Sequence, residues 1–366
     1  NLSIVSFPEF IYEASKDKKR IVIGGSHGKT TITSMILHCL NSMEINFDYL
    51  VGANIAGFDT MVRLSDAPVI ILEGDEYLSS PLDNSPKFHW YRPHVALLSG
   101  IAWDHANVYP DVEKYEAAFE KFLDLIEEEG TLIYFEDDPA VKIMAKFLNK
   151  SVKCLPYSSP DYEIVNGKTV VNTPGGKIEI PVFGEHNMQN LQAARLICAE
   201  LGVDEDSFFD VIRSFTGASN RLENIASNDK KCVYKDFAHS PSKVKATVQA
   251  CKSQYDDRKL VACLELHTYS SLNINFIQQY AGSLDMADQS FVYFNPAVVA
   301  RKKLPAITPE FVKESFENNN LRVFTDSQEL EQALTSLDTE NANLLIMSSG
   351  NFDNLDLTSI ANKWIG

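Results

Sequence analysis

"VIGGSHGKTTITSMILHCL", residues 22–40, joins a short β-branched run to a glycine-rich turn and then to a segment with helical spacing of apolar residues. Such a strand–turn–helix unit can cradle phosphate, because backbone N–H groups and the helix N-terminus point into the turn. The P-loop pattern G-x-x-x-x-G-K-[ST] nearly fits, but its first glycine would fall at Ile23. We expect Lys29 to reach the outer phosphates and Thr30 to ligate Mg²⁺. The alternative is an ordinary strand-to-helix turn with a surface lysine.

Acidic and imidazole side chains follow two further apolar runs. "ILEGDEYLSS" (71–80) presents three carboxylates, Glu73 first, and "GIAWDHANVY" (100–109) presents Asp104 and His105. Ligands of open α/β sheets collect at the carboxyl ends of the strands, where a carboxylate can hold Mg²⁺ against a triphosphate. The non-functional alternative for the first segment is a solvated acidic turn. For the second segment it is a packed or capping histidine. Their joint occurrence beside a P-loop favours a metal–nucleotide site.

Strand and helix patterns alternate along the chain, which predicts mostly parallel sheets. The segment 162–186 contains Asn-Gly and Gly-Gly turns between short strands and predicts a hairpin insertion. After 215–223 the alternation starts again, so we place a domain boundary near 217–224. The patterns predict strands at 20–25, 47–51, 69–73 and 94–100 and helices at 29–43, 113–130 and 190–203, and then helices near 241–255, 274–287, 308–318 and 327–337 between five further strands.

Composition limits the classes of function. The 366 residues are enough for two domains, and 45% hydrophobic with 23% charged residues is typical of soluble globular proteins. A net charge of −17 argues against a nucleic-acid or anionic-membrane binder, because no broad positive field attracts phosphates. The six cysteines are scattered without a C-x-x-C pair, which indicates reduced thiols and a cytoplasmic location. The sequence does not indicate the oligomeric state.

These motifs together resemble the Mur ligase family, ATP-dependent amide-forming enzymes of peptidoglycan synthesis. The family's P-loop is the shorter form G-[ST]-x-G-K-[ST], which "GGSHGKTT" fits with Gly25 and Ser26. Further marks are "GEHNMQN" (184–190), "FTGASNRLE" (215–223), "DFAHSPSKV" (236–244) and "MSSGNF" (347–352). The resemblance implies an α/β fold in which a P-loop-type central ATPase domain, with a mostly parallel sheet and the hairpin insertion, precedes a Rossmann-like C-terminal domain. It implies a linker at 1–20, the central ATP-binding domain at 21–219 and the C-terminal domain at 220–366.

The resemblance also implies the reaction. The lactyl carboxylate of UDP-N-acetylmuramate attacks the γ-phosphate of ATP, and an amine then displaces phosphate from the acyl phosphate. The segment 75–109 resembles the murein peptide ligases, which attach a cell-wall tripeptide during peptidoglycan recycling. "LELHTYSS" (264–271) instead resembles the branch that adds L-alanine, so that amine stays open as the alternative.

Site residues carry over from the family motif by motif. In the central domain Lys29 neutralises phosphate charge, Thr30 and Glu73 hold one Mg²⁺, and His105 is implied as the ligand of a second Mg²⁺. His239 faces the amine substrate, and Arg221 and His239 join Lys29 and His105 as the implied catalytic group. The implied ATP-binding residues are Gly25, Ser26, His27, Gly28, Lys29, Thr30, Thr31, His186, Asn187, Asn190, Arg221 and Asp236. The chain departs from the family pattern at Asn220, Ser240 and Gly100.

Two other classes remain open at this stage: a P-loop ATPase or kinase, and a catalytically silent nucleotide-binding scaffold. Family members carry a UDP-binding domain of on the order of 100 residues before the P-loop, and here only 23 residues precede Gly24. We therefore expect this domain to be missing from the 366-residue chain, which would then bind ATP–Mg²⁺ but ligate poorly. We also expect that alanine at Lys29 abolishes ligation and leaves the fold intact.

Overall fold

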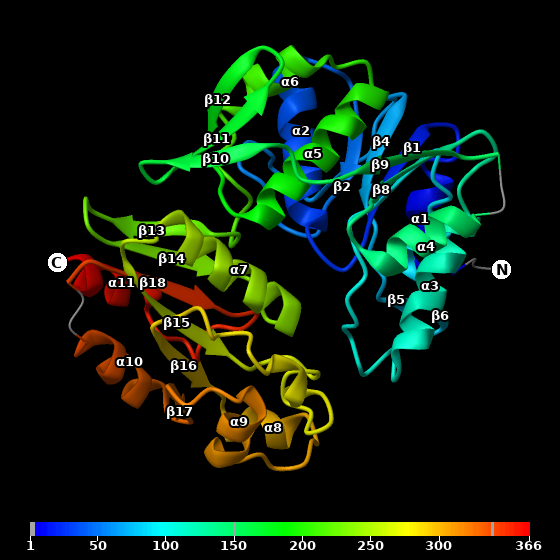
Figure 1. The fold of residues 1–366 in the computed structure, drawn as a ribbon. Coiled ribbons are helices and arrows are strands. Elements are labelled where there is room, and N and C mark those ends of the chain that lie inside the picture. The colour runs from blue at the N-terminus through cyan, green and yellow to red at the C-terminus, as the bar shows by residue number, and fades with distance from the viewer. Residues whose placement is uncertain (1–3, 149–150, 338–339) are drawn as a thin grey trace. The chain divides into compact units, whose positions relative to one another are not determined.

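The computed structural model describes residues 4–148, 151–337 and 340–366, and the chain divides into two compact units, Asn1–Ser219 and Asn220–Gly366 (Figure 1). Within the described residues, none of the helices combines the length and the apolar character needed to cross a bilayer.

Unit 1 is built on a seven-stranded sheet in the order β3-β2-β4-β1-β7-β8-β9. All neighbours pair in parallel except β3, which is antiparallel to β2. β1 lies in the middle and is buried from Arg20 to Gly24, so the chain reaches the carboxyl edge of the sheet at the glycine-rich turn. The strands are β1 (Lys19–Gly24), β2 (Asp48–Leu50), β3 (Val62–Arg63), β4 (Val69–Glu73), β7 (Val95–Leu98), β8 (Thr131–Phe135) and β9 (Lys153–Tyr157).

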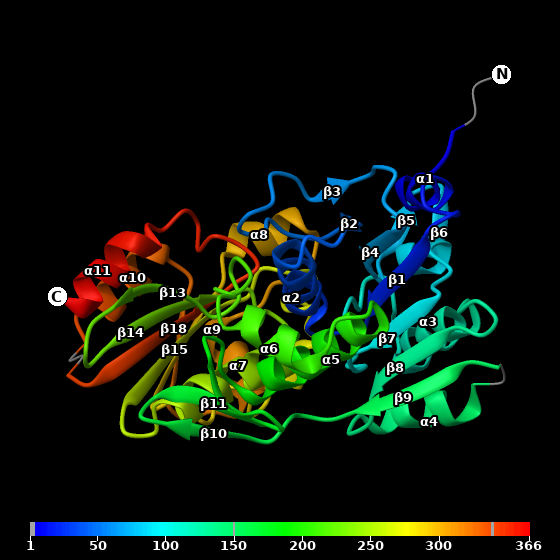
Figure 2. The same ribbon diagram turned by 90° about the horizontal axis from the view of Figure 1, so that it is seen from above.

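Helices cover both faces of this sheet because successive strand residues point to opposite sides. Ile21 and Ile23 pack with α2 (Lys29–Ser42), α5 (Glu185–Glu200) and α6 (Glu205–Ile212). Val22 lies in the core on the opposite face. That core also holds residues of α1 (Phe7–Glu13), the 3₁₀ helix η1 (Lys87–Trp90), α3 (Val112–Asp124) and α4 (Pro139–Phe147). Figure 2 shows α3 and α4 together on one side of the strands and α2 and α5 on the other.

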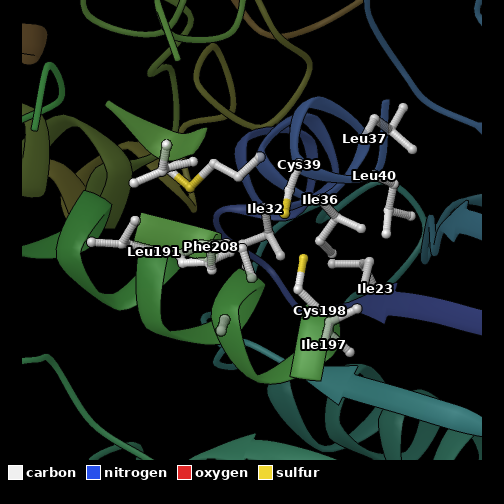
Figure 3. Close-up of a cluster of buried hydrophobic side chains, with 14 of the residues drawn as sticks. Ile23, Ile32, Ile36, Leu37, Cys39, Leu40, Leu191, Ile197, Cys198 and Phe208 are labelled. Carbon is white, nitrogen blue, oxygen red and sulfur yellow. The ribbon is translucent and has the colours of Figure 1, made fainter. Parts of the chain in front are cut away.

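The pairing of α2 with α5 holds the P-loop helix in place. Figure 3 shows side chains of both helices, among them Ile36 and Cys39 of α2 and Ile197 and Cys198 of α5, pointing toward one another over Ile23 of β1. Each of these aliphatic side chains is fully buried, and such burial contributes about 1.5–3 kcal/mol per residue. The first turn of α2 therefore has a fixed position at the sheet edge.

The segment predicted as a hairpin insertion is a separate three-stranded antiparallel sheet, β10-β11-β12. Asn166 and Gly167 form its first turn, both with positive φ (52° and 73°), which matches the Asn-Gly signal. A second small hairpin follows β4. The strands are β10 (Tyr162–Val165), β11 (Lys168–Thr173), β12 (Gly176–Ile180), and β5 (Leu78–Ser80) with β6 (Asp83–Pro86) in the second hairpin.

Unit 2 contains a six-stranded sheet in the order β13-β14-β18-β15-β16-β17, parallel except for the edge strand β13. Helices α10 and α11 pack on one face, and α7 contacts β15 and β18. The strands are β13 (Glu223–Ser227), β14 (Cys232–Asp236), β15 (Lys259–Glu265), β16 (Gln289–Tyr293), β17 (Leu321–Phe324) and β18 (Ala342–Met347), and the helices are α7 (Pro241–Gln254), α8 (Pro296–Arg301), α9 (Pro309–Phe316), α10 (Ser327–Thr335) and α11 (Leu357–Ile365). Both units confirm the predicted α/β class.

One predicted helix is wrong. Residues 274–287 contain only the short 3₁₀ helix η2 (Ile277–Tyr280). Their buried apolar side chains recur at helical spacing, which produced the prediction. However, the Asn273 side chain accepts the Asn275 N–H in a local turn, and Gly282 adopts φ +71°. Both features compete with helical geometry.

Candidate nucleotide-binding site

The glycine-rich turn between β1 and α2 has the geometry of an anion cradle. Gly28 caps α2 with φ +72°, and no side chain caps the helix there. Its first N–H groups are therefore left for another acceptor. A Cβ at Gly28 would collide with the amide of Asn190, and a Cβ at Gly25, at φ +125°, would collide with Ser99. Only glycine fits these two positions.

Lys29 points back over the turn. Its Nζ donates to the Gly25 carbonyl at 2.6 Å and to Glu76 Oε2 at 2.7 Å. Burial lowers the pKa of Lys29, but the nearby carboxylates, Glu76 foremost, outweigh it and leave the pKa above its usual value. The lysine therefore keeps its charge inside the fold.

The three carboxylates at the end of β4 and just after it have different partners. Glu73 Oε1 accepts the Thr30 hydroxyl at 2.8 Å, and its Oε2 accepts the Gly52 N–H at 2.8 Å. Asp75 pairs with Lys87 at 2.6 Å. Glu76 turns inward to Lys29 and is almost fully buried. The sequence prediction selected Glu73 and did not assign a role to Glu76.

Glu76 gathers donors from several segments. Tyr115 of α3 donates to its Oε1 at 3.1 Å, and Tyr109 donates to its backbone carbonyl. Burial raises the pKa of this carboxyl, but the Lys29 charge and the contacts with His105 outweigh it and hold the pKa well below its usual range. Glu76 is thus an ionised acceptor at neutral pH inside unit 1. Its only sequence signal is a second acid just past a buried strand.

His105 lies beside Glu76. Its Nε2 is 3.5 Å from Glu76 Oε1, and its ring meets the Tyr77 ring edge-on at 5.4 Å between centroids. The backbone of His105 is left-handed, with φ +55°, which is uncommon for a non-glycine residue. The structure therefore brings His105, Lys29 and Glu76 together at the carboxyl edge of the sheet.

The motif on α5 also reaches the P-loop. Asn190 lies against Gly28, and its Nδ2 donates to Asn187 Oδ1 at 3.3 Å, while Asn187 Nδ2 donates to the Phe183 carbonyl at 2.9 Å. His186 Nδ1 is buried, and no described residue bonds to it. Burial lowers the pKa of His186 to about 4, so the ring is neutral at neutral pH.

We expect protonation of His186 to destabilise the native chain at acid pH. Its pKa is 6.5 when unperturbed and about 4 in the fold, so between these values the unfolded chain binds a proton that the native chain excludes. Stability from this residue is complete above about pH 6.5 and falls as the pH approaches about 4. Denaturant unfolding measures the free energy of unfolding across this pH window. It should fall less steeply toward acid pH for His186→Asn than for wild type. Equal slopes in the two proteins would show that His186 is not the group responsible.

The other predicted P-loop residues have structural partners. The Ser26 N–H donates to the Gly100 carbonyl and the Ala102 N–H donates to Ser26 Oγ, both at 2.9 Å, which ties the turn to the loop after β7. The Ser99 hydroxyl donates to the His27 carbonyl at 2.5 Å. Thr31 is buried in the first turn of α2.

Three predicted site residues, Arg221, Asp236 and His239, belong to unit 2. Both Asp236 oxygens accept backbone N–H groups, from Leu222 at 2.7 Å and Ala238 at 2.6 Å, and burial raises its pKa. The Arg221 guanidinium lies 4.7 Å from the Phe237 ring centroid. His239 Nδ1 lies 2.7 Å from the Phe237 carbonyl oxygen.

The three departures from the family pattern have local roles. Asn220 has φ +54°, and its N–H donates to Glu223 at 2.9 Å. Ser240 is the N-cap of α7 and is buried, and its hydroxyl has no hydrogen bond from the described residues. Gly100 has φ +131°, a conformation that glycine adopts readily.

Comparisons with known proteins show the family to which both units are similar. A family model described as the Mur ligase middle domain matches residues 23–198, and one described as the Mur ligase glutamate ligase domain matches residues 220–350. The UDP-N-acetylmuramate–L-alanine ligase of Paenarthrobacter aurescens is 28% identical over 341 residues, covering 90% of this chain and 72% of that protein. The same enzyme of Caldicellulosiruptor bescii is 28% identical over 308 residues, covering 80% of this chain and 65% of that protein. The murein peptide ligase of Psychrobacter arcticus has a similar fold, with a TM-score of 0.68, 21% identity and coverage of 98% of this chain and 81% of that one.

Proposed function

Because the chain belongs to the Mur ligase family of ATP- and Mg²⁺-dependent, ADP-forming amide ligases, we propose that it joins the lactyl carboxylate of UDP-N-acetylmuramate to an amine. The observation that carries this proposal is the P-loop with its buried Lys29–Glu76 pair. The carboxyl edge of the sheet suits a metal–nucleotide substrate, because a lysine, an uncapped helix N-terminus and a threonine–carboxylate pair lie there together.

The residues present fit ATP and Mg²⁺. The Thr30 hydroxyl and the Glu73 carboxylate lie 2.8 Å apart and offer the oxygen ligands that Mg²⁺ prefers. No group of three or more His, Cys, Asp or Glu side chains in the described part of the chain is arranged to hold a metal. Mg²⁺ commonly takes one or two carboxylates and completes its shell with phosphate oxygens and water. When bound, the ion neutralises charge on the phosphates.

The side chains have distinct roles in this proposal. Lys29 neutralises charge that develops on the phosphates, as a preorganised cation in a site of low dielectric constant. Asn187 and Asn190 offer amide donors and acceptors to the base, and His186 offers a neutral ring nitrogen. In unit 2, Arg221 and Asp236 contact the nucleotide and His239 faces the amine, each by its match to the family motif.

Two amines are candidates. The segment 75–109, which contains Glu76 and His105, supports a cell-wall tripeptide through its resemblance to murein peptide ligases. L-Alanine is the second candidate, because the sequence relatives described above are named UDP-N-acetylmuramate–L-alanine ligases and 264–271 resembles the motif of that branch. In this segment His267 Nδ1 lies 3.3 Å from the buried Glu265 carboxylate, at a position where recycling ligases usually carry arginine.

An ADP-release assay with UDP-N-acetylmuramate tests the proposal. ATP, Mg²⁺ and UDP-N-acetylmuramate are supplied with the tripeptide L-alanyl-γ-D-glutamyl-meso-diaminopimelate, with L-alanine, or with no amine. We expect slow release of ADP that depends on both UDP-N-acetylmuramate and one amine, with the tripeptide preferred. Binding of ATP without release under any of these conditions would instead support a nucleotide-binding scaffold. Release that is independent of the amine would indicate a simple ATPase.

Glu73→Ala and His105→Ala should each raise the Mg²⁺ concentration needed for half-maximal activity, Glu73→Ala by more. Carboxylate oxygen is a better Mg²⁺ ligand than imidazole nitrogen. Glu73 also orients the Thr30 hydroxyl directly, whereas His105 lies against Glu76. A Mg²⁺ titration of ADP release measures both changes, with Asp75→Ala as the control because its partner Lys87 lies outside the P-loop. Unchanged Mg²⁺ curves in both variants would remove these residues from the metal site.

A further inference from the structure

Tyr115 connects the P-loop to Glu76. It belongs to α3, is fully buried, and has its hydroxyl 2.8 Å from Ser26 Oγ and 3.1 Å from Glu76 Oε1. Its ring is held edge-on between Tyr109 and Phe119, with centroids 5.0 and 5.1 Å away. The phenol is therefore fixed between two segments that are separate in the sequence.

The direction of each hydrogen bond follows from the chemistry of the groups. An ionised carboxylate only accepts, so the Tyr115 hydroxyl donates to Glu76. Its oxygen then accepts from the Ser26 hydroxyl, and Ser26 Oγ accepts the Ala102 N–H at 2.9 Å. Burial raises the pKa of Tyr115 well above its usual value, so the phenol keeps its proton. The bonds form one chain, from Ala102 through Ser26 and Tyr115 to Glu76.

The far end of this chain reaches Lys29. Glu76 Oε2 accepts the lysine at 2.7 Å, while Oε1 takes the tyrosine hydroxyl and lies 3.5 Å from His105. With one oxygen fixed by Tyr115, the carboxylate has a defined orientation, and so does the ammonium group that it holds. A hydrogen bond to an ionised group is stronger than one between neutral groups.

We propose that Tyr115 is a positioning residue of the nucleotide site: its hydroxyl orients the Glu76 carboxylate and, through it, Lys29 for Mg²⁺–ATP. This inference rests on the proposed function. A purely structural role predicts a different result, because a buried hydroxyl that only satisfies its neighbours changes stability and leaves nucleotide affinity unaltered.

Calorimetric titration of Mg²⁺–ATP into four proteins separates the two roles. They are wild type, Tyr115→Phe, Glu76→Gln and the double variant, with thermal unfolding recorded for each. We expect Tyr115→Phe to bind about tenfold more weakly than wild type, the size expected for one hydrogen bond to a charged group. In the Glu76→Gln background the same substitution should change affinity by less than about twofold, because its effect passes through the carboxylate.

Tyr157→Phe is the matched control. Tyr157 is also buried in unit 1, on β9, so this substitution removes a buried hydroxyl away from Glu76, and Mg²⁺–ATP affinity should stay at the wild-type value. Where Tyr115→Phe does not fold, Ser26→Ala removes the donor on the other side of the phenol. Because Ser26 also belongs to the P-loop, only the part of its effect on affinity that is lost in the Glu76→Gln background reports on Tyr115.

Three results overturn the inference. The first is that Tyr115→Phe binds Mg²⁺–ATP as tightly as wild type does. The second is that Tyr115→Phe weakens binding equally with and without the Glu76 carboxylate. The third is that Tyr157→Phe weakens binding as much as Tyr115→Phe does. Failure of the wild-type chain to bind Mg²⁺–ATP would refute the proposed function itself, and this inference with it.

Discussion

Lys29→Ala is expected to lower ATP-dependent ligation by about a thousandfold, the upper end of the range for loss of one group that stabilises transition-state charge. The lysine ends 2.6 Å from the Gly25 carbonyl, inside the phosphate turn. The structure changes the expectation for stability. Alanine leaves the buried Glu76 carboxylate without its cation, and loss of one partner from a buried pair costs about 3–5 kcal/mol. Because the variant is less stable, ADP release and Mg²⁺–ATP binding are both measured and are both expressed per folded molecule.

Lys18→Ala is the matched control for this experiment. Lys18 pairs at 2.8 Å with Asp48, a fully buried carboxylate of the same unit that lies on β2 and not in the P-loop. Both alanine variants should lose stability, and only Lys29→Ala should lose activity per folded molecule. Near wild-type turnover in folded Lys29→Ala would refute the assignment of the nucleotide site.

Glu76→Gln is expected to have the second-largest effect. It should weaken Mg²⁺–ATP binding and slow ligation, and the two losses together should amount to about a hundredfold, comparable to loss of one preorganised group. The substitution keeps the shape of the side chain and removes its charge. An amide has only one acceptor oxygen, so its NH₂ group faces either Lys29 or Tyr115, both of which donate to Glu76 in the wild type. The pKa of Lys29 also falls, because Glu76 is the main group that raises it.

Asp48→Asn provides the corresponding control, since it neutralises a buried carboxylate that pairs with Lys18. Its ligation rate per folded molecule should equal that of wild type. A double-mutant cycle between Lys29→Ala and Glu76→Gln measures how far the pair acts as a unit. Full additivity of the two losses would show that the lysine and the carboxylate contribute independently, contrary to the geometry.

The elements that sequence patterns predicted well are those whose signal is local. The helix that begins at Lys29 and the turn at Asn166–Gly167 follow from apolar spacing and from residues that tolerate positive φ. The helix prediction at 274–287 was wrong for a reason that is also local, because an Asx turn at Asn273 competes with the helical geometry that the apolar spacing favours. The edge strand β13 (Glu223–Ser227) was not predicted, and its exposed residues have little of the apolar pattern that marks a strand.

By itself, the sequence determined the class of this protein. A β-branched strand, a glycine turn and Lys29–Thr30 predict a phosphate cradle, because the required backbone conformations and the helix N-terminus are set within a few consecutive residues. The position of Glu73 at a strand end could be inferred as well, since carboxyl ends of parallel strands share an edge.

Only the tertiary structure decided which side chains meet at that edge. Lys29 and Glu76 are 47 residues apart, Ser26 and Tyr115 are 89 apart, and Asn190 reaches Gly28 from α5. Glu73, Asp75 and Glu76 are equivalent as a pattern of acids, and the direction of each side chain depends on the local backbone and on the donors that it meets: Thr30 and Gly52 for Glu73, Lys87 for Asp75 and Lys29 for Glu76. Tyr115 has the apolar spacing of a core residue in α3, and its hydroxyl acquires a role only because packing of α3 against the sheet places it between Ser26 and Glu76.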